Sequence, residues 1–370
     1  MDKYDVAIIG AGIAGSTLAI LLAKEGKSVV VFEKNKLPKH KVCGEFVSME
    51  SYNFFKSIGL NLDQWNLPII KNLRLTSQNG DFLRSDMDVG GFGISRYKLD
   101  LELAKLMIEN GVTFLEQTKV THATKNQVSF DNKTIHASLV VSAHGKYSPS
   151  YNKQLRLRKS KNYVAVKYHI RGDFSEDLIT LHSFEQGYCG MSKVEDDLYC
   201  LCYLVNSTLL KSNNNNISEL EKNVLHKNEL LKQLFKEADF VWKKPLTISN
   251  IQFTKNKLVQ DGIIQVGDAA GAISPLSGNG MSIAAKSALL LSQLILLHND
   301  ESTLISTYEK NWNRLFLSKT QKASILNQIM LNPLRHSIVL KLLKLFSPLR
   351  KKIINEMQGD EFVRSSSLIR

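Results

Sequence analysis

The feature that most constrains the fold is the order of patterns in the first 34 residues. An apolar run from Tyr4 to Ile9 leads directly into the glycine-rich segment GAGIAG, residues 10–15, and Ser16 to Glu25 has helical composition. A second apolar run, Ser28 to Phe32, ends at the acid Glu33. Strand, glycine turn, helix, strand and acid in this order predict a dinucleotide-binding βαβ unit.

Each glycine of this segment has a separate physical task. Gly10 allows the tight turn, Gly12 lets the backbone approach a pyrophosphate, and Gly15 lets helix and strand pack closely. The helix start, with Ile13 and Ala14, offers unpaired N–H groups and a positive dipole end to phosphates. Glu33 follows at close to the spacing of about 20 residues where a carboxylate accepts hydrogen bonds from a ribose diol. The alternative is a glycine-rich turn that binds no dinucleotide. The two strands, the helix and the acid that surround the turn disfavour this alternative.

Length and cysteine content bound the class of protein. At 370 residues the chain exceeds one small core, so two domains are expected. Four cysteines without framework spacing indicate a reducing cytosol. Asp2, Asp5 and the early glycines argue against a signal peptide. The sequence offers no run of about 18 apolar residues, and Ser287 to Asn299, the nearest candidate, is too short to span a membrane.

The charge balance is strongly basic. The net charge is +13, from 48 Lys and Arg against 35 Asp and Glu. The basic residues are spread along the chain without a recognition module, so we expect no nucleic-acid partner. A positive field does suit anionic cofactors and anionic lipid surfaces. Residues 331–370 carry eight Lys and Arg against three acids. Our hypothesis places Leu342–Ile354 near the inner face of a membrane, as a peripheral contact of a cytoplasmic protein; a packed, solvated helix is the alternative.

The remaining patterns alternate between strands and helices. A helix is expected from Met49 to Ile58, ending at Gly59, and an amphipathic helix carries Leu99, Leu103, Leu106 and Met107. Expected strands and hairpins lie at residues 71–94 (with turns at 79–81 and 90–91), 112–115, 120–124, 128–130, 134–136, 139–143 and 262–266. Residues 163–251 read as an antiparallel sheet with a helix at about 218–238, and helices follow from 282 onward.

A lysine-rich loop follows the first unit. Lys34 to Lys41 leads into Val42-Cys43-Gly44-Glu45. One interpretation places a cation, Lys34 or Lys41, beside the pyrophosphate and Cys43-Gly44 near the ring that the dinucleotide carries. A solvated connection is the other, and position in the chain does not decide between them. Gly44 implies a close backbone approach.

The other cysteines and the histidines give no metal signature. Cys200 and Cys202 share a strand face with Leu198 and Leu204, and buried small hydrophobes explain them better than metal ligands do. Cys189 either lines a substrate cavity or packs in the core. We interpret the histidines at 122, 136 and 169 as isolated sheet residues, and no catalytic base and no metal ligand is assigned.

Three motifs in this order resemble the FAD-dependent aromatic hydroxylase and geranylgeranyl-reductase superfamily. They are Gly10–Glu33, Ile94–Leu101 with Arg96, and Gly267–Met281, and the likeness covers about residues 1–300. Leu139–Gly145 resembles that family's strand ending in Asp-Gly, with His144 in place of Asp. Lys41–Glu45 and the Gly-Tyr-Cys-Gly segment at 187–190 resemble the reductase branch.

The resemblance implies an α/β protein with a Rossmann-like FAD-binding domain of the glutathione-reductase type, an inserted antiparallel-sheet substrate domain and C-terminal helices. The expected division is 1–70, 96–162 and 252–300 for the FAD-binding domain, 71–95 and 163–251 for the substrate domain, and 301–370 for the C-terminal helical region.

The resemblance also implies roles at the cofactor. Asp268 would accept hydrogen bonds from the ribityl hydroxyls, and Pro275 would pack against the isoalloxazine ring. The N–H groups of Gly280 and Met281 would face the N1–C2=O edge of the ring. Arg96 would lie near the pyrophosphate or ribityl chain, a surface salt bridge being the alternative. The candidate cofactor-binding set is Gly10, Gly12, Ile13, Ala14, Gly15, Glu33, Lys34, Lys41, Cys43, Gly44, Arg96, Val120, Gly267, Asp268, Pro275, Gly278, Gly280 and Met281.

Three functions follow as hypotheses. Because one dinucleotide-binding unit is visible, NAD(P)H would act as a transient reductant. The favoured function is a monooxygenase that hydroxylates a hydrophobic aromatic or polyketide-type molecule. The alternative is a geranylgeranyl-reductase-like enzyme, although the reductase branch's aromatic motif after Gly187-Tyr188 is missing. The tryptophan-rich signature of flavin halogenases is absent too. A flavin-binding protein that associates with a membrane or partner without turnover is the third.

Overall fold

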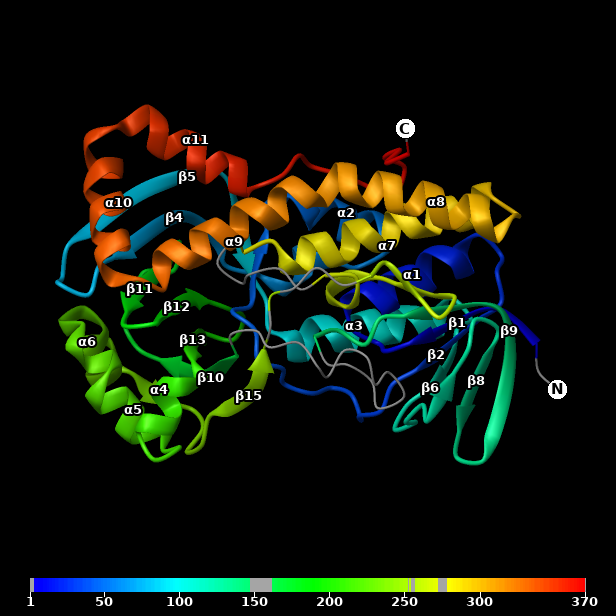
Figure 1. Ribbon diagram of the computed structural model, residues 1–370, viewed down its shortest axis with the longest axis horizontal. Helices are drawn as coiled ribbons and strands as arrows, with labels where there is room; N and C mark the ends of the chain where they lie inside the picture. Colours follow the sequence, from blue (N-terminus) through cyan, green and yellow to red (C-terminus); the bar gives the residue numbers. More distant parts are fainter. Residues whose placement is uncertain (1–2, 147–161, 252, 254–256, 272–277, 370) are drawn as a thin grey trace.

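The structure is a computed structural model that describes residues 3–146, 162–251, 253, 257–271 and 278–369. Two β-sheets lie beside each other along the long axis of the molecule, with helices over both (Figure 1). The first sheet contains the N-terminal βαβ unit. The second is built mainly from residues 69–93 and 163–251.

The first sheet has a parallel centre. Its strands run in the order β16-β17-β9-β1-β2-β6, and β9, β1, β2, β6 and β17 pair in parallel. A hairpin extension, β7 and β8, joins β9 antiparallel. The strands are β1 (Lys3–Ile9), β2 (Val29–Phe32), β6 (Thr113–Leu115), β7 (His122–Ala123), β8 (Gln127–Phe130), β9 (Lys133–Ser142), β16 (Val259–Gln260) and β17 (Ile263–Gln265).

Both faces of this sheet are covered, which explains the unbroken apolar run in β1. Val6 and Ile8 point into a cluster shared with helices α1 (Ile13–Lys24), α3 (Arg96–Glu109) and α7 (Gly280–Leu297). Ala7 and Ile9 point the other way, into a cluster with β7 and β8. Because successive strand residues face opposite sides, only an apolar run satisfies both layers.

The second sheet is antiparallel except for one pair. Its order is β14-β10-β13-β12-β11-β4-β5-β3, with β15 also paired to β10 and with β11 and β4 parallel. The strands are β3 (Phe46–Ser48), β4 (Ile69–Thr76), β5 (Phe82–Gly93), β10 (Tyr163–Arg171), β11 (Leu178–Phe184), β12 (Gly187–Lys193), β13 (Tyr199–Asn206), β14 (Asp239–Phe240) and β15 (Leu246–Ile251).

The two faces of β10 have different characters. Val164, Val166 and Tyr168 pack toward α5 (Ile217–Asn223) and α6 (Glu229–Glu237) in one apolar cluster. The alternate residues face the opposite side, where Tyr163 and Ala165 are apolar but Lys167 and His169 are not. This second face looks toward the loop before β3, and it positions part of the site described below.

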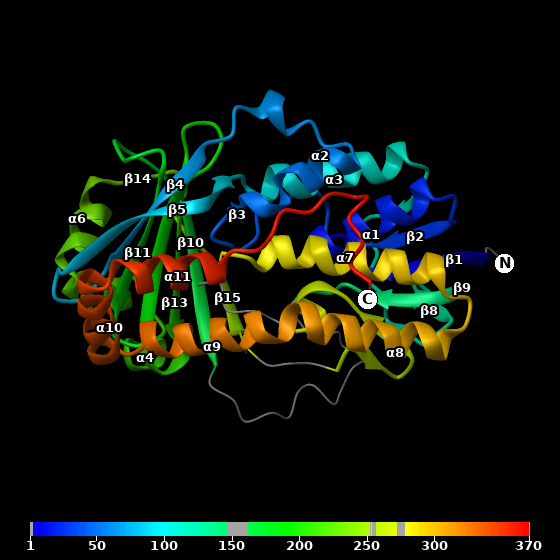
Figure 2. The ribbon, with the colours of Figure 1, turned by 90° about the horizontal axis from the view of Figure 1, so that it is seen from above.

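Helices frame the rest of the molecule. The path from α8 through η7 to α9 runs along the molecule from the first sheet to the second, and α10 and α11 then pack on β5 (Figures 1 and 2). The bounds are η1 (Met49–Ser51), α2 (Tyr52–Ile58), η2 (Leu62–Trp65), α4 (Ser207–Ser212), η4 (Leu225–Lys227), η5 (Gly267–Ala269), α8 (Glu301–Trp312), the π-helical η7 (Asn313–Leu317), α9 (Ser318–Met330), α10 (Pro333–Leu345) and α11 (Ser347–Met357).

The segment after α11 returns to the first sheet's helices. The amide of Gln358 donates to the carbonyl of Gly90, and the ring of Phe362 stacks on Phe54 at 4.7 Å between centroids. The backbone N–H of Leu368 donates to the side chain of Gln293 in α7. This tail therefore links the helices over both sheets (Figure 2).

The fold class is confirmed, and three local expectations were wrong. The single helix expected at 218–238 is divided into α5, η4 and α6, because Asn228 caps α6 and donates its amide to Ser77, Ser183 and Thr76. The strands expected at 134–136 and 139–143 are one strand, β9. Gly90-Gly91 is not a turn: both lie in β5, where Gly90 has φ +66° and the register with β4 shifts.

Helix α7 is long and apolar enough to cross a membrane by length and composition alone. However, 61% of it is buried inside the fold, where it packs on α1. Burial of this kind is typical of a core helix, because a spanning helix would expose its sides to lipid. The division into domains stays a prediction; β3 pairs in the second sheet although it lies in the segment predicted for the FAD-binding domain.

Candidate functional site

The glycine turn has the geometry that its motif predicts. Gly10 has φ +111°, and a Cβ there would lie 2.6 Å from the carbonyl oxygen of Ala143. A Cβ on Gly15 would lie 2.0 Å from the carbonyl oxygen of Gly10, so helix and turn are in direct contact. At Gly12 the nearest atom to a Cβ would be Nη2 of Arg96, at 3.8 Å. The turn is thus closely packed on the protein side and open at Gly12.

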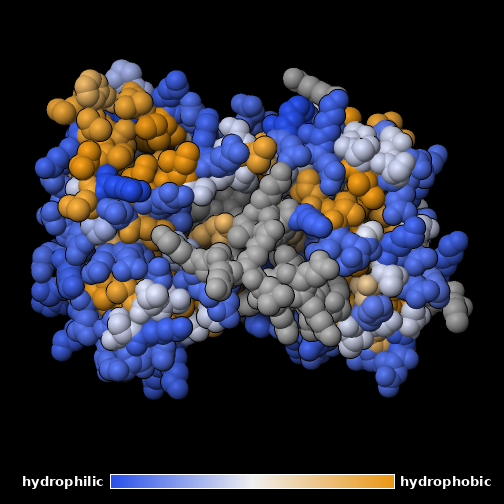
Figure 3. All heavy atoms as spheres, viewed as in Figure 1, coloured by the Kyte–Doolittle hydropathy of each residue, from blue (hydrophilic) through white to orange (hydrophobic). Residues whose placement is uncertain are grey.

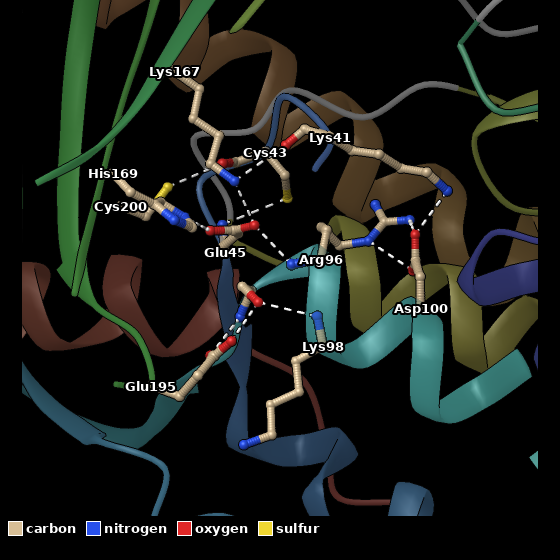
Figure 4. Close-up of polar contacts among 11 residues, drawn as sticks. Lys41, Cys43, Glu45, Arg96, Lys98, Asp100, Lys167, His169, Glu195 and Cys200 are labelled. Carbon is tan, nitrogen blue, oxygen red and sulfur yellow. Dashed lines mark hydrogen bonds and ion pairs between the residues drawn. The ribbon is translucent and has the colours of Figure 1, made fainter. Parts of the chain in front are cut away.

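The open side of the turn carries positive charge. Helix α1 begins after Gly12 without a side-chain cap, so its first N–H groups are available to an anion. Arg96, at the start of α3, lies next to Gly12 and pairs with the buried Asp100 through Nε at 3.0 Å and Nη2 at 2.8 Å. Lys41 reaches the same carboxylate at 2.7 Å (Figure 4). Asp100 therefore holds two cations beside the turn.

Glu33 lies at the end of β2 and is buried. One of its oxygens accepts from the backbone N–H of Ala11 at 3.2 Å, and the other accepts from the backbone and amide of Asn35. The carbonyl of Glu33 accepts from Thr118, which brings the buried Val120 into the same region. Lys34 is exposed next to Glu33. A ribose diol at this position remains a prediction.

The second glycine motif brings the start of α7 to the same end of the sheet. Gly267 has φ +65°, and a Cβ on it would lie 2.7 Å from the Cβ of Ala14 in α1. Asp268 is half-buried, and the described residues show no partner for its carboxylate. Gly280 and the buried Met281 begin α7, and a Cβ on Gly280 would meet nothing within 4 Å. Pro275 lies outside the described residues.

The Lys41–Glu45 loop leads into β3 and η1, and these two elements lie against the start of α7. A Cβ on Gly278 would lie 2.9 Å from the ring of Phe46, and the hydroxyls of Ser51 and Ser282 are 3.1 Å apart. At Gly44, in the same loop, a Cβ would meet nothing within 4 Å. The open backbone positions Gly44 and Gly280 therefore belong to neighbouring segments.

Glu45 anchors this loop to the second sheet. Its carboxylate is fully buried and accepts from the backbone N–H of Arg96 at 2.7 Å (Figure 4). It forms an ion pair with Lys167, and its second oxygen is 2.6 Å from Nε2 of His169. The thiol of Cys200 donates to the carbonyl of Cys43 at 3.2 Å. We call Glu45, Lys167 and His169, with Cys200, the Glu45 cluster.

The charges of the Glu45 cluster stabilise one another. Burial alone would raise the pKa of Glu45, but the ammonium of Lys167 and the imidazole of His169 outweigh it and lower the pKa to about 2. Burial likewise opposes the charge on Lys167, yet the carboxylate of Glu45 beside it raises its pKa. At neutral pH the cluster therefore holds a carboxylate and an ammonium. Glu45 also has φ +56°, a strained backbone that the three contacts hold in place.

Aromatic rings close the outer side of the Glu45 cluster. Trp242 stacks on His169 at 4.7 Å, and His40 contacts Trp242, His169 and Tyr97. Burial and the charge of Lys167 lower the pKa of His40 to about 4, so it is neutral at pH 7. Burial also lowers the pKa of His144, after β9, to about 4. Neither ring carries a positive charge under ordinary conditions.

Sequence reasoning missed the Glu45 cluster. The interpretation of His169 as an isolated sheet residue was wrong, because the ring contacts both Glu45 and Trp242. The available signal was Lys167 and His169 two positions apart on one face of an otherwise apolar strand. Cys189 faces the apolar cluster with α5 and α6, so packing describes it better than a cavity lining does.

Ligand-type atoms of Glu45, His169 and Cys200 lie within 4.8 Å of one another, a spacing that suits a metal ion. Lys167 already neutralises Glu45, however, and burial raises the pKa of Cys200 well above its usual range, so the thiol stays protonated. Metal ligands are deprotonated. The group is therefore better described as an ion-paired cluster.

The described residues fit an FAD molecule at separate points. Gly12, Gly44 and Gly280 each leave the space that a Cβ would occupy open, and α1 begins uncapped beside Arg96. Among the described residues the carboxylate of Asp268 has no partner, which suits the hydroxyls of a sugar-like chain. Each of the three motifs predicted to bind the cofactor thus contributes to one end of the first sheet.

A family model described as an FAD binding domain matches residues 3–321. The chain is 24% identical over 355 residues to conditioned medium factor receptor 1 of Dictyostelium discoideum, covering 85% of this chain and 68% of the relative. It is 23% identical over 330 residues to digeranylgeranylglycerophospholipid reductase of Methanococcus vannielii, covering 84% and 82%. It is 22% identical over 351 residues to squalene monooxygenase of Rattus norvegicus, covering 84% of this chain but 58% of that enzyme.

Solved structures share the fold at low identity. A geranylgeranyl bacteriochlorophyll reductase-like protein from Thermoplasma acidophilum superposes with a TM-score of 0.78 at 18% identity, covering 98% of this chain and 97% of the other. A flavin-dependent brominase gives 0.78 at 18% identity, covering 96% and 93%. At such identities the likeness concerns the architecture.

Proposed function

Because the chain belongs to the FAD binding domain family and is an FAD-dependent oxidoreductase, we propose that it acts on carbon–carbon double bonds of a long, apolar, isoprenoid-type substrate. Two of the relatives described above carry names that state different reactions, a monooxygenation and a reduction, but both names state an isoprenoid substrate. That shared substrate class is why we propose an isoprenoid in place of the aromatic ring that the sequence favoured.

The observation that carries the proposal is the apolar face beside the Glu45 loop. Tyr163, Ala165 and Leu204 from the second sheet form a cluster with Ile251 and Met330, and Val42, one residue before Cys43, packs against it. These side chains are buried against one another, so a substrate would bind along the edge of the cluster, where Val42 leads into the loop proposed to border the ring. Such a lining favours a hydrocarbon chain over a charged or sugar-like molecule.

The chain's own residues would divide the binding of FAD among them. The N–H groups of Ile13 and Ala14, with Arg96 and Lys41, would hold the pyrophosphate, and Glu33 the adenosine ribose. Asp268 would hold the ribityl chain. Gly44, Gly280 and Met281 would border the ring, where FAD supplies hydride or activates oxygen.

The Glu45 cluster would position the ring-bordering loop. Lys167 and His169 hold Glu45 from the second sheet, and Glu45 in turn holds the first N–H of α3. Ser95, which caps α3, donates its N–H to Glu195 at 2.8 Å, a second link between the sheets. The substrate face and the cofactor loop are thus fixed relative to each other, which is what a reaction between two bound molecules requires.

Between the two reactions we favour reduction. The segment Cys43-Gly44-Glu45 resembles the reductase branch, and the alignment to the reductase covers most of that relative, whereas the alignment to squalene monooxygenase covers 58% of it. Oxygen insertion is the second candidate, supported by the same apolar face and by the name of that monooxygenase. NAD(P)H is the proposed transient reductant for both.

To test this, the FAD-reconstituted protein is incubated with a geranylgeranyl lipid and either NADH or NADPH. The incubation is done once without oxygen and once with oxygen. Mass spectrometry of the lipid decides: a gain of two hydrogens without oxygen supports reduction, and a gain of one oxygen atom supports monooxygenation. If neither NADH nor NADPH bleaches the flavin, the proposal of NAD(P)H as reductant is wrong. Dithionite is then used as the reductant, so that the substrate class is still tested. An unchanged lipid under all conditions contradicts the proposed substrate class.

A further inference from the structure

Helix α10 is apolar on two opposite faces. Its inner face, His336, Leu340 and Leu343, is buried against the second sheet. Its outer face carries Leu334 and Ile338, which are 78% and 61% exposed. At 3.6 residues per turn these two sets project from opposite sides of the helix. A surface helix ordinarily has a polar outer face, so the exposed side needs an explanation.

The exposed apolar side chains continue beyond Ile338 to the start of α11. Leu342 and Leu349 are each 45% exposed, Phe346 is 55% exposed and Leu345 is 76% exposed. Figure 3 shows the hydrophobic surface over α10 and α11. We call this surface the α10 ridge: Leu334, Ile338, Leu342, Leu345, Phe346 and Leu349. Contiguous exposed side chains of this size mark an interaction site more often than scattered single residues do.

Basic residues flank the α10 ridge. Arg335 and Lys341, both exposed, lie on either side of the apolar stripe by helical spacing, and Lys351 and Lys352 are exposed on α11. Lys344 pairs with Asp81 and so is partly neutralised. The region 331–370 retains five more basic than acidic residues. An apolar stripe flanked by cations is complementary to a surface with an apolar interior and a negatively charged outer layer.

We infer that the α10 ridge docks on an anionic lipid bilayer. Leu334, Ile338 and Leu345 would enter the boundary between headgroups and acyl chains, while Arg335 and Lys341 stay among the phosphates. The contact is peripheral, because the one helix of spanning length in the described residues, α7, is mostly buried in the core. None of the residues of the α10 ridge is among the proposed flavin contacts, so the membrane contact and the proposed reaction are tested independently.

The docking surface overlaps the segment that the sequence suggested but has different ends. The hypothesis placed Leu342–Ile354 near lipid, but Ile353 and Ile354 are half-buried and Ile353 packs on the cluster around Leu83. The exposed stripe begins earlier, at Leu334. Because α10 also packs on β5 and β11, docking would place the second sheet close to the membrane.

The test is co-sedimentation of the FAD-loaded protein with vesicles of phosphatidylcholine, with or without phosphatidylglycerol. We expect binding to the anionic vesicles at low salt, and weaker binding at high salt because exposed charges are screened. Ile338→Gln with Leu345→Gln should weaken binding about tenfold or more. Leu297→Gln is the matched control: Leu297 is 60% exposed at the far end of α7, away from α10 (Figure 1).

Flavin content and circular dichroism confirm that each variant is folded. No binding of the wild-type protein to anionic vesicles overturns the inference, and so does equal binding by the double variant. Analytical ultracentrifugation tests the other occupant of such a ridge: a wild-type dimer that the double variant abolishes, without vesicle binding, would assign the ridge to a second copy of the chain instead.

Discussion

Replacing Lys167 with methionine should destabilise the protein more than any substitution of a surface lysine. The Lys167 and Glu45 side chains are fully buried and form an ion pair. Methionine preserves the length of the side chain but leaves a buried carboxylate whose remaining partners among the described residues are His169 and one backbone N–H. Removing one partner of a buried pair leaves an uncompensated charge in a poorly polarisable environment.

Two routes give the size of the effect. Folding lowers the pKa of Glu45 from 4.5 to about 2, which stabilises the folded state at neutral pH by about 3 kcal/mol. Breaking buried pairs in other proteins costs about 3–5 kcal/mol. We therefore expect Lys167→Met to lower the free energy of unfolding by about 3 kcal/mol. Lys167→Met together with Glu45→Gln should lose less, because no unpaired charge remains.

The assay is urea unfolding followed by tryptophan fluorescence, to which Trp242 contributes because it stacks on His169. Since the folded-state pKa of Glu45 lies below its unfolded value, its stabilisation is complete above about pH 4.5 and is lost as the pH falls through about 2. In Lys167→Met the folded-state pKa of Glu45 rises toward its unfolded value, so the part of the acid-induced loss of stability that Glu45 causes should become smaller.

The matched control is Lys232→Met, which breaks an ion pair with Glu229 whose side chains are 55% and 76% exposed. It should cost less than about 1 kcal/mol. A loss below about 1 kcal/mol in Lys167→Met at pH 7, or a double variant as unstable as the sum of both single changes, would refute the reasoning.

Four further predictions concern the cofactor turn and α10. Gly12→Ala should weaken FAD binding about tenfold or more, measured by flavin fluorescence, yet leave the apoprotein's unfolding unchanged, because its Cβ would meet no protein atom closer than 3.8 Å. Gly15→Ala should instead destabilise the apoprotein, since its Cβ would lie 2.0 Å from the oxygen of Gly10; equal stability of the two variants contradicts this. Arg96→Met should also weaken FAD binding and make that binding less dependent on salt, because Lys41 remains as the second cation. Burial lowers the pKa of His336 to about 4, so stability should fall as the pH drops from about 6.5 toward 4, and His336→Leu should flatten that part of the stability curve.

The local patterns of the sequence predict the geometry of the glycine turn and the position of the acid beside it. Gly10, Gly12, Gly15 and Glu33 lie within 24 residues of one another along the chain, where spacing determines geometry. The start of α3 was also predictable, because Leu99 and Leu103 repeat at helical spacing and both are buried. In these segments neighbours in sequence are neighbours in space.

The Glu45 cluster was not predictable in the same way. Glu45 and Lys167 are separated by 122 positions, and their contact depends on how the second sheet lies against the loop before β3. Nothing in either local pattern specifies that placement. Helix composition likewise did not reveal the break at Asn228, whose amide is satisfied by groups from β4 and β11. Ion pairs and helix caps between elements that are distant in the sequence can be identified only once the fold is known.

The tail after α11 has a consequence for the order of events during synthesis. Phe362 fills the space beside Phe54, and the two are separated by 308 positions. At translation rates of about 5–20 residues per second, roughly 15–60 s pass before the later ring emerges. During this time the N-terminal part of the chain, including Phe54, keeps some of its apolar surface exposed to solvent. Its final packing is a late event, although its strands are made first.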